Sequence, residues 1–260
     1  MKYLASDLDG TLIYNGVIRK EDVDAIVRLK DSGYKFIIST GRTIGSIDEF
    51  FSKYPEIEYD YIIGCNGAII LDKNRNVIYE NYINSEIGED LLRNFMDEKK
   101  CCAHFESEGK NYLIDPITSD DIKEHMYYFQ EVVSREDVLK EKRKYTTISL
   151  FTRDKSIGRA QTVRDKIAKM YGDRLEVFRN QYFIDIAPKE CSKGNAIEKV
   201  LELDGGHVDK LYTIGDSFND ISMFKITKNS FTFNNSEEEV KANANNYVDS
   251  VSECIDRILD

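Results

Sequence analysis

The sequence predicts an α/β protein in which a Rossmann-like parallel-sheet core is interrupted by an inserted α+β segment. Near both ends of the chain, short apolar runs alternate with amphipathic helical patterns, which is typical of βαβ units and a parallel sheet. Between about residues 82 and 187 the pattern changes to helices followed by pairs of strand-like runs. The length of 260 residues also exceeds the usual size of a single hydrophobic core.

The first third of the chain has the clearest alternation of strand and helix. Gly33 ends the first helical pattern, whose apolar residues recur at helical spacing from Val23 to Leu29. A polar turn over 72–76 lies between two apolar runs and predicts a hairpin near the sheet edge. In chain order we expect a strand ending at residue 7, a helix over 21–32, a strand over 35–39, a helix over 44–51 and a strand over 61–64.

The middle of the chain predicts the insert, with Ser85 as the candidate N-cap of its first helix. Its expected elements are a helix over 85–99, a hairpin of 103–106 and 111–114 through Gly109, a helix over 119–129, a strand over 146–151, a helix over 156–171, and strands over 175–178 and 182–186. A self-contained unit is the simplest account of them.

The last part of the chain returns to alternation and should rejoin the first part in one sheet. Its expected elements are a helix over 194–201, a strand over 210–214, a short helix after 219, a strand over 231–233, and helices over 237–243 and 250–259. The predicted division is a core of residues 1–81 and 188–260 and an insert of residues 82–187.

Composition and charge exclude several classes of function. The net charge is −11, from 47 acidic against 36 basic residues, which argues against nucleic-acid partners because their phosphates require a basic face. No apolar run approaches the roughly 20 residues of a membrane helix, and the N-terminus has no signal-peptide pattern. We therefore expect a cytoplasmic protein without membrane partners, and no pattern indicates its oligomeric state.

The cysteines and histidines indicate neither a disulfide framework nor a zinc site. Five cysteines without a CxxC pair are typical of reduced, mostly buried thiols. The three histidines are scattered and form no HExxH pattern, which disfavours a zinc hydrolase.

The most informative feature is the pair Asp7 and Asp9, which ends the first strand and is followed at once by Gly10 and Thr11. Open α/β sheets bind their ligands at the carboxyl ends of such strands. Two carboxylates so close together repel each other unless a cation or a shared proton relieves them, which indicates a metal site or acid/base chemistry. The alternative is an Asp-Gly surface turn.

Four further segments favour a metal site or acid/base chemistry over a surface turn. In most of them an apolar run is followed by polar residues and a glycine. They are 35–42, which ends in Thr40, Gly41 and Arg42; 65–68, which contains Asn66; 185–194, which ends in Lys193 and Gly194; and 211–220, which contains Asp216, Asn219 and Asp220.

In this order the motifs resemble those of the haloacid dehalogenase superfamily of phosphatases, specifically its Cof-type branch. The resemblance extends from Asp7 to about Val240. A lone Asp-x-Asp-Gly-Thr motif would be a weak signal, but five motifs in the family's order make coincidence improbable. The resemblance implies a catalytic core and a large α/β cap of type IIB, inserted between the third and fourth motifs, that selects the substrate.

The resemblance also implies the roles of the acidic residues. Asp7 is the expected nucleophile, which forms an aspartyl-phosphate, and Asp9 is the expected general acid and base. The expected cofactor is Mg²⁺, held by one oxygen of Asp7, the main-chain carbonyl of Asp9 and the carboxylate of Asp216. Asp220 is expected to reach the ion, directly or through water, or to orient another of its ligands.

Phosphate and substrate contacts are expected from a second group of residues. Thr40 and Lys193 would hold the transferring phosphoryl oxygens, and the expected substrate-binding residues are Gly41, Arg42, Asn66 and Asn219. Structural alternatives stand beside these roles. A threonine is common at strand ends, Lys193 could face solvent in a first helical turn, and the segment 215–220 could be an Asx-rich turn.

The resulting hypothesis is a magnesium-dependent phosphatase that hydrolyses small phosphorylated metabolites, with sugar phosphates as the favoured class. A phosphomutase or phosphotransferase of the same superfamily differs only in the acceptor. A dehalogenase would not need an acid at Asp9, and a phosphoacceptor receiver domain would be about half as long. An inactive phosphate-binding protein would be expected to lack one of the residues Asp7, Asp9, Lys193 or Asp216, and all four are present.

Overall fold

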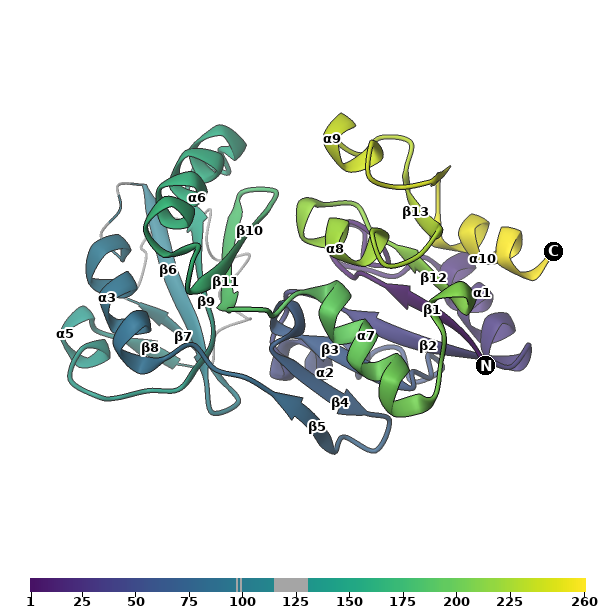
Figure 1. Cartoon of the computed structure of the whole chain (residues 1–260), viewed down its shortest axis with the longest axis horizontal. Coiled ribbons are helices and arrows are strands. Elements are labelled where there is room, and N and C mark those ends of the chain that lie inside the picture. The colour runs from purple at the N-terminus through teal and green to yellow at the C-terminus, as the bar shows by residue number, and fades with distance from the viewer. Residues whose placement is uncertain (97, 99, 115–130) are drawn as a thin grey trace. The chain divides into compact units, whose positions relative to one another are not determined.

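The computed structural model describes residues 1–96, 98, 100–114 and 131–260. Its contacts divide the chain into two units (Figure 1). The first, here the core unit, comprises Met1–Gly41, Glu49–Tyr79 and Ser192–Asp260, and the second, the insert unit, comprises Arg42–Asp48 and Glu80–Cys191. The sequence pattern did not indicate that Arg42–Asp48 would group with the insert.

The core unit is built on a sheet of eight strands in the order β14-β13-β12-β1-β2-β3-β4-β5. The central strand β1 is parallel to both β2 and β12, so that Ser6 lies opposite Ile38 and Ile214. Because β12 follows the insert in sequence, this pairing confirms that the two ends of the chain form one sheet. The strands are β1 (Lys2–Ser6), β2 (Tyr34–Ser39), β3 (Tyr61–Gly64), β4 (Ile69–Asp72), β5 (Val77–Glu80), β12 (Leu211–Ile214), β13 (Asn229–Phe233) and β14 (Asn246–Val248).

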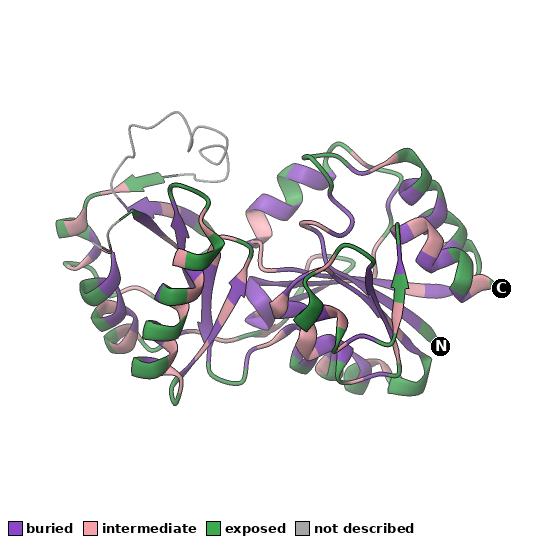
Figure 2. Cartoon of the chain, turned by 90° about the horizontal axis from the view of Figure 1, so that it is seen from above, coloured by how far each residue is buried: buried purple, intermediate pink, exposed green. Residues whose placement is uncertain are grey.

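Helices cover this sheet and bury its apolar side chains. Tyr3, Ala5 and Ile37 pack against apolar residues of α7 and α8, while α1 and α10 pack against each other. Buried residues follow the strands, and the helices carry buried and exposed residues on different sides (Figure 2). The helices of this part are α1 (Lys20–Asp31), α7 (Lys193–Asp204), α8 (Ile221–Phe224), α9 (Glu238–Lys241) and α10 (Val251–Leu259). The helix α2 (Ile44–Phe51) begins in the insert unit and ends in the core unit.

The last residue of α7 is tied to three core strands. The carboxylate of Asp204 accepts hydrogen bonds from the Tyr3 hydroxyl at 2.8 Å, the Lys35 ammonium at 2.6 Å and the Tyr61 hydroxyl at 3.1 Å. At the other end, the Ser192 side chain caps α7 by accepting from the Asn195 amide. Both ends of this helix are therefore fixed by hydrogen bonds.

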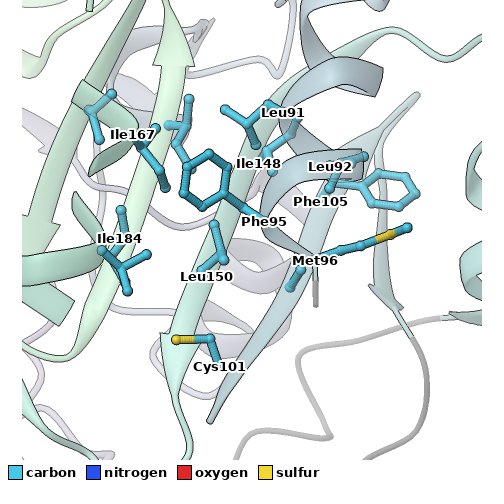
Figure 3. Packing of buried hydrophobic residues seen from close by; sticks show 14 of the residues in the cluster. Leu91, Leu92, Phe95, Met96, Cys101, Phe105, Ile148, Leu150, Ile167 and Ile184 are labelled. Carbon is cyan, nitrogen blue, oxygen red and sulfur yellow. The ribbon is translucent and has the colours of Figure 1, made fainter. Parts of the chain in front are cut away.

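The insert unit has a sheet of six strands in the order β10-β11-β9-β6-β7-β8. The helices α3 (Ser85–Phe95) and α6 (Ile157–Tyr171) contribute Leu91, Phe95 and Ile167 to an apolar cluster with Ile148 and Ile184 of the sheet (Figure 3). The strands are β6 (Cys101–Ser107), β7 (Lys110–Ile114), β8 (Glu131–Val133), β9 (Tyr145–Thr152), β10 (Leu175–Asn180) and β11 (Phe183–Pro188), and α5 (Arg135–Val138) is a further short helix.

The structure corrects the start of α3. The expected cap Ser85 lies inside the helix, and the side chain of Asn84 instead accepts from the amides of Glu86 at 3.0 Å and Ile87 at 3.4 Å. The helix ends at Phe95 and not at residue 99. The expected helix over 119–129 lies outside the described residues. The pattern missed β8, α5 and β14, because three or four residues are too few to show a period.

Two expectations from composition are also tested. All five cysteines are free and buried, as predicted. Among the residues that the structure describes, no helix is both long enough and apolar enough to cross a membrane.

We predict that Asn84→Ala lowers the free energy of unfolding of the insert unit by about 0.5–2 kcal/mol, because two amides at the start of α3 lose their acceptor. Ser85→Ala is the matched control and should change it little, since alanine is a good helix former. Urea denaturation of both variants measures the difference. An equal loss in both would contradict the assignment of Asn84 as the cap.

Candidate active site

The candidate site lies where three neighbouring parallel strands of the core unit end. Asp7 directly follows β1, and its amide donates to the carbonyl of Ile214 on β12 at 3.0 Å. Thr40 directly follows β2, and Asp216 lies two residues beyond β12. The parallel pairing places these strand ends at one edge of the sheet, which is where open α/β sheets bind ligands.

Lys193 is fully buried. The alternative that it faces solvent in the first turn of a helix is therefore wrong. Its ammonium donates to Oδ1 of Asp7 at 2.6 Å and to Oδ1 of Asp220 at 2.5 Å. Burial by itself lowers the pKa of Lys193, but Asp220 and Asp7 outweigh burial and hold this pKa above its ordinary value. A lysine charged at neutral pH therefore lies between two carboxylates with almost no access to water.

Asp7, Asp216 and Asp220 form a compact group of carboxylates. One oxygen of each lies within 4.8 Å of the other two. Burial raises the pKa of Asp7 to about 7, against the opposing effect of Lys193. Burial and the neighbouring Asp7 likewise raise the pKa of Asp216 well above its usual range. Shifts in this direction are expected where carboxylates are buried together without enough positive charge to balance them.

The donor set fits a hard divalent cation. Oδ2 of Asp7 is buried and has no hydrogen-bond partner, and a carboxylate oxygen is a preferred ligand of Mg²⁺. Asp220 is oriented differently, since its Oδ2 accepts from the amides of Asp216 and Ser217, both at 2.9 Å. Its Oδ1 accepts from Lys193. Both carboxylate oxygens of Asp220 therefore already accept hydrogen bonds from the protein.

Glycines let the loops approach the acidic group closely. Gly10 has φ +85°, and a Cβ built on it would lie 2.5 Å from Oδ2 of Asp216. Next to it, the Thr11 hydroxyl donates to Oδ1 of Asp216 at 2.8 Å. The sequence analysis gave Thr11 no role, although its place in the first motif was a usable signal.

A second set of contacts links Thr40 to two asparagines. The Asn66 amide donates to the Thr40 carbonyl at 3.0 Å, and the Asn219 side-chain amide donates to Oδ1 of Asn66 at 3.0 Å. Oδ1 of Asn219 is buried without a partner. Asn66 has φ +52°, a conformation that asparagine tolerates better than most residues.

The remaining predicted residues are placed as follows. Asp9 is partly exposed and forms a strand-like bridge with Ile13. Gly41 is the last residue of its segment of the core unit, whereas Arg42 belongs to the insert unit. The core unit therefore brings together Asp7, Asp216, Asp220 and Lys193, and separately Thr40, Asn66 and Asn219, but not Arg42.

Comparison with known proteins identifies the family of this architecture. The model of the haloacid dehalogenase-like hydrolase family matches residues 4–256. Pyridoxal phosphate phosphatase YbhA of Escherichia coli is 25% identical, over 98% of this chain and 97% of its own length. The 5-amino-6-(5-phospho-D-ribitylamino)uracil phosphatase YwtE of Bacillus subtilis is 24% identical, over 93% and 90%.

A solved structure shows the same fold. The subclass IIB sugar phosphatase BT4131 superposes with a TM-score of 0.83 at 22% identity, over 99% of both chains.

We predict that Gly10→Ala weakens Mg²⁺ binding, because its new methyl group would collide with the Asp216 carboxylate. Gly16→Ala is the matched control, since Gly16 has a similar φ of +79° but open space around its Cβ position. Both variants should lose about 1–2 kcal/mol of stability from the left-handed backbone. Calorimetric titration with Mg²⁺ distinguishes them, and equal affinity in both variants would contradict this account of Gly10.

Proposed function

The chain belongs to the haloacid dehalogenase-like hydrolase family, and from this premise we propose that it is a magnesium-dependent phosphatase of small phosphorylated metabolites. The observation that carries the proposal is the buried Lys193 between Asp7 and Asp220, beside a carboxylate oxygen of Asp7 that has no partner. A nucleophilic carboxylate and a fixed cation next to it are what phosphoryl transfer requires of a protein.

In the proposed reaction, a carboxylate oxygen of Asp7 attacks phosphorus and the bond between phosphorus and the leaving oxygen breaks. Asp9 gives its proton to the leaving alcohol, and the product on the enzyme is an aspartyl-phosphate. Asp9 then takes a proton from water, whose oxygen attacks the phosphorus. Inorganic phosphate leaves and the Asp7 carboxylate is restored.

The other residues would neutralise and orient the phosphoryl group. Lys193 supplies a charge that burial keeps in one place, and the Thr40 hydroxyl supplies a directed hydrogen bond. Asn66 and Asn219, which bond each other, would contact the phosphate or the substrate's hydroxyls. Asp7, Asp216 and the main-chain carbonyl of Asp9 would hold Mg²⁺, with Asp220 orienting the site, and the bound ion would offset the charge of the phosphoryl oxygens.

We propose sugar phosphates as the favoured substrates, and the insert as the part that selects among them. Support comes from the sugar phosphatase with the same fold, while the named activities of YbhA and YwtE show that relatives also act on other phosphorylated metabolites. A phosphomutase or phosphotransferase would use the same aspartate chemistry with a sugar hydroxyl as acceptor. The cytoplasmic location inferred from the sequence stays a prediction.

A screen of phosphorylated metabolites with Mg²⁺ tests the proposal. We expect release of inorganic phosphate, loss of turnover in excess chelator, and recovery when Mg²⁺ is restored. Isomerised sugar phosphate without free phosphate would favour the mutase instead. Full activity in excess chelator would contradict the metal assignment.

We predict that Asp7→Asn removes the activity almost completely while the protein stays folded, because an amide cannot attack phosphorus. Asp9→Asn should be slower by about 10²–10⁴-fold on an alkyl phosphate. It should still form the aspartyl-phosphate with an aryl phosphate, whose leaving group needs no proton, although the later attack by water stays slow because Asp9 also serves as its base. Steady-state rates on the alkyl phosphate and the initial burst of aryl alcohol on the aryl phosphate give the comparison, and a wild-type rate in Asp7→Asn would place the nucleophile elsewhere.

A further inference from the structure

Two hydrogen bonds of one serine in the core unit join the backbone beside Lys193 to the loop that carries Asp220. The amide of Gly194, the residue after Lys193, donates to Oγ of Ser222 at 3.1 Å. The Ser222 hydroxyl in turn donates to the carbonyl of Asn219, the residue before Asp220, at 3.2 Å. A single hydroxyl can accept and donate in this way at the same time. Ser222 therefore connects two segments that each carry a charged residue of the candidate site.

Together with the ion pair, these bonds close a ring of contacts around the buried charges. The ammonium of Lys193 donates to Oδ1 of Asp220 at 2.5 Å and so connects the same two segments through their side chains. A lysine ammonium stands on a flexible four-carbon stem, so this side-chain contact alone is compatible with several positions of the start of α7. The bonds of Ser222 connect the two backbones and select one of these positions.

The start of α7 also packs closely against α8, to which Ser222 belongs (Figure 1). A Cβ built on Gly194 would lie 2.3 Å from the carbonyl oxygen of Ser222. This close packing limits how near the two backbones can come. The hydrogen bonds add a direction, because they weaken steeply when donor and acceptor are misaligned. Packing and hydrogen bonds together therefore fix the start of α7 against the Asp220 loop.

We propose that Ser222 is a positioning residue, which holds the start of α7 so that the Lys193 ammonium meets Asp7 and Asp220 in the geometry that phosphoryl transfer requires. The inference rests on the proposed phosphatase function. Ser222 acts through the backbones on either side of it, and its effect reaches the phosphoryl group through Lys193. Loss of its hydroxyl should therefore weaken the binding of phosphate whatever leaving group a substrate carries.

The test compares Ser222→Ala, which removes the hydroxyl, with Ser222→Thr, which keeps it. In Ser222→Ala we expect the dissociation constant of inorganic phosphate, measured by calorimetry with Mg²⁺, to rise by about threefold to tenfold. The value of kcat/KM for p-nitrophenyl phosphate should fall by a similar factor. Ser222→Thr should be near wild type in both measurements. An equal deficit in the two variants, or no deficit in Ser222→Ala, would overturn the proposal.

A control variant separates positioning from general weakening of the core unit. Ser250 caps α10 by accepting from the amide of Glu253 at 2.9 Å, which is also a bond from the first turn of a helix to a serine hydroxyl. The helix α10 packs against α1. Ser250→Ala should lower the urea midpoint but leave the dissociation constant of phosphate unchanged. A rise in that constant equal to the rise in Ser222→Ala would refute the positioning role.

Hydrogen exchange, which needs no substrate, separates failure of this inference from failure of the proposed function. The Gly194 amide should exchange about threefold to tenfold faster in Ser222→Ala than in Ser222→Thr. A wild-type protein that is inactive on every phosphate ester but shows this difference would refute the phosphatase and support Ser222 as the anchor of the Lys193 backbone. An active protein without this difference would refute the positioning role, and an inactive one without it would refute both.

Discussion

The candidate site depends on one buried cation, the ammonium of Lys193, between the carboxylates of Asp7 and Asp220. Taking three charges out of water is expensive, and it is tolerated only where the charges are paired at short range. Removal of the lysine would leave two buried carboxylates uncompensated, at a cost of about 3–5 kcal/mol. The same lysine therefore maintains the fold of this sheet edge and provides the charge that the proposed chemistry needs.

Other features of the core unit follow from that arrangement. Asp220 can face Lys193 with one oxygen because its second oxygen is satisfied by the amides of Asp216 and Ser217. The loops can come this close because glycine stands at positions 10 and 215, where a Cβ would lie 2.5 Å from Asp216 and 2.4 Å from Asp220. The raised pKa values of Asp7 and Asp216 are the residual cost of this crowding.

Much of the fold and the clustering of the acidic residues could be predicted, because the central strands β1, β2, β3 and β12 are mostly apolar runs that end next to polar residues or glycine. The expected bounds of α2 and β3 agree with the structure residue by residue. What could not be predicted depends on contacts between distant residues. The bond from Thr11 to Asp216 joins positions 205 residues apart, and the bond from Asn111 to Thr43 joins positions 68 apart. The choice between the neighbours Asn84 and Ser85 as cap depends on backbone angles that composition does not determine.

The helix α7 has a consequence for how such an enzyme can diversify. Lys193 is its first residue and Asp204 its last, and Asp204 is bonded to residues of β1, β2 and β3. At 12 residues, the helix is a stiff rod about 18 Å long with both ends secured to one sheet. In the proposed reaction, the phosphate would therefore have to reach a lysine whose position is fixed. Substrates with new leaving groups could then be accommodated in evolution by changes in other parts of the chain, without movement of Lys193.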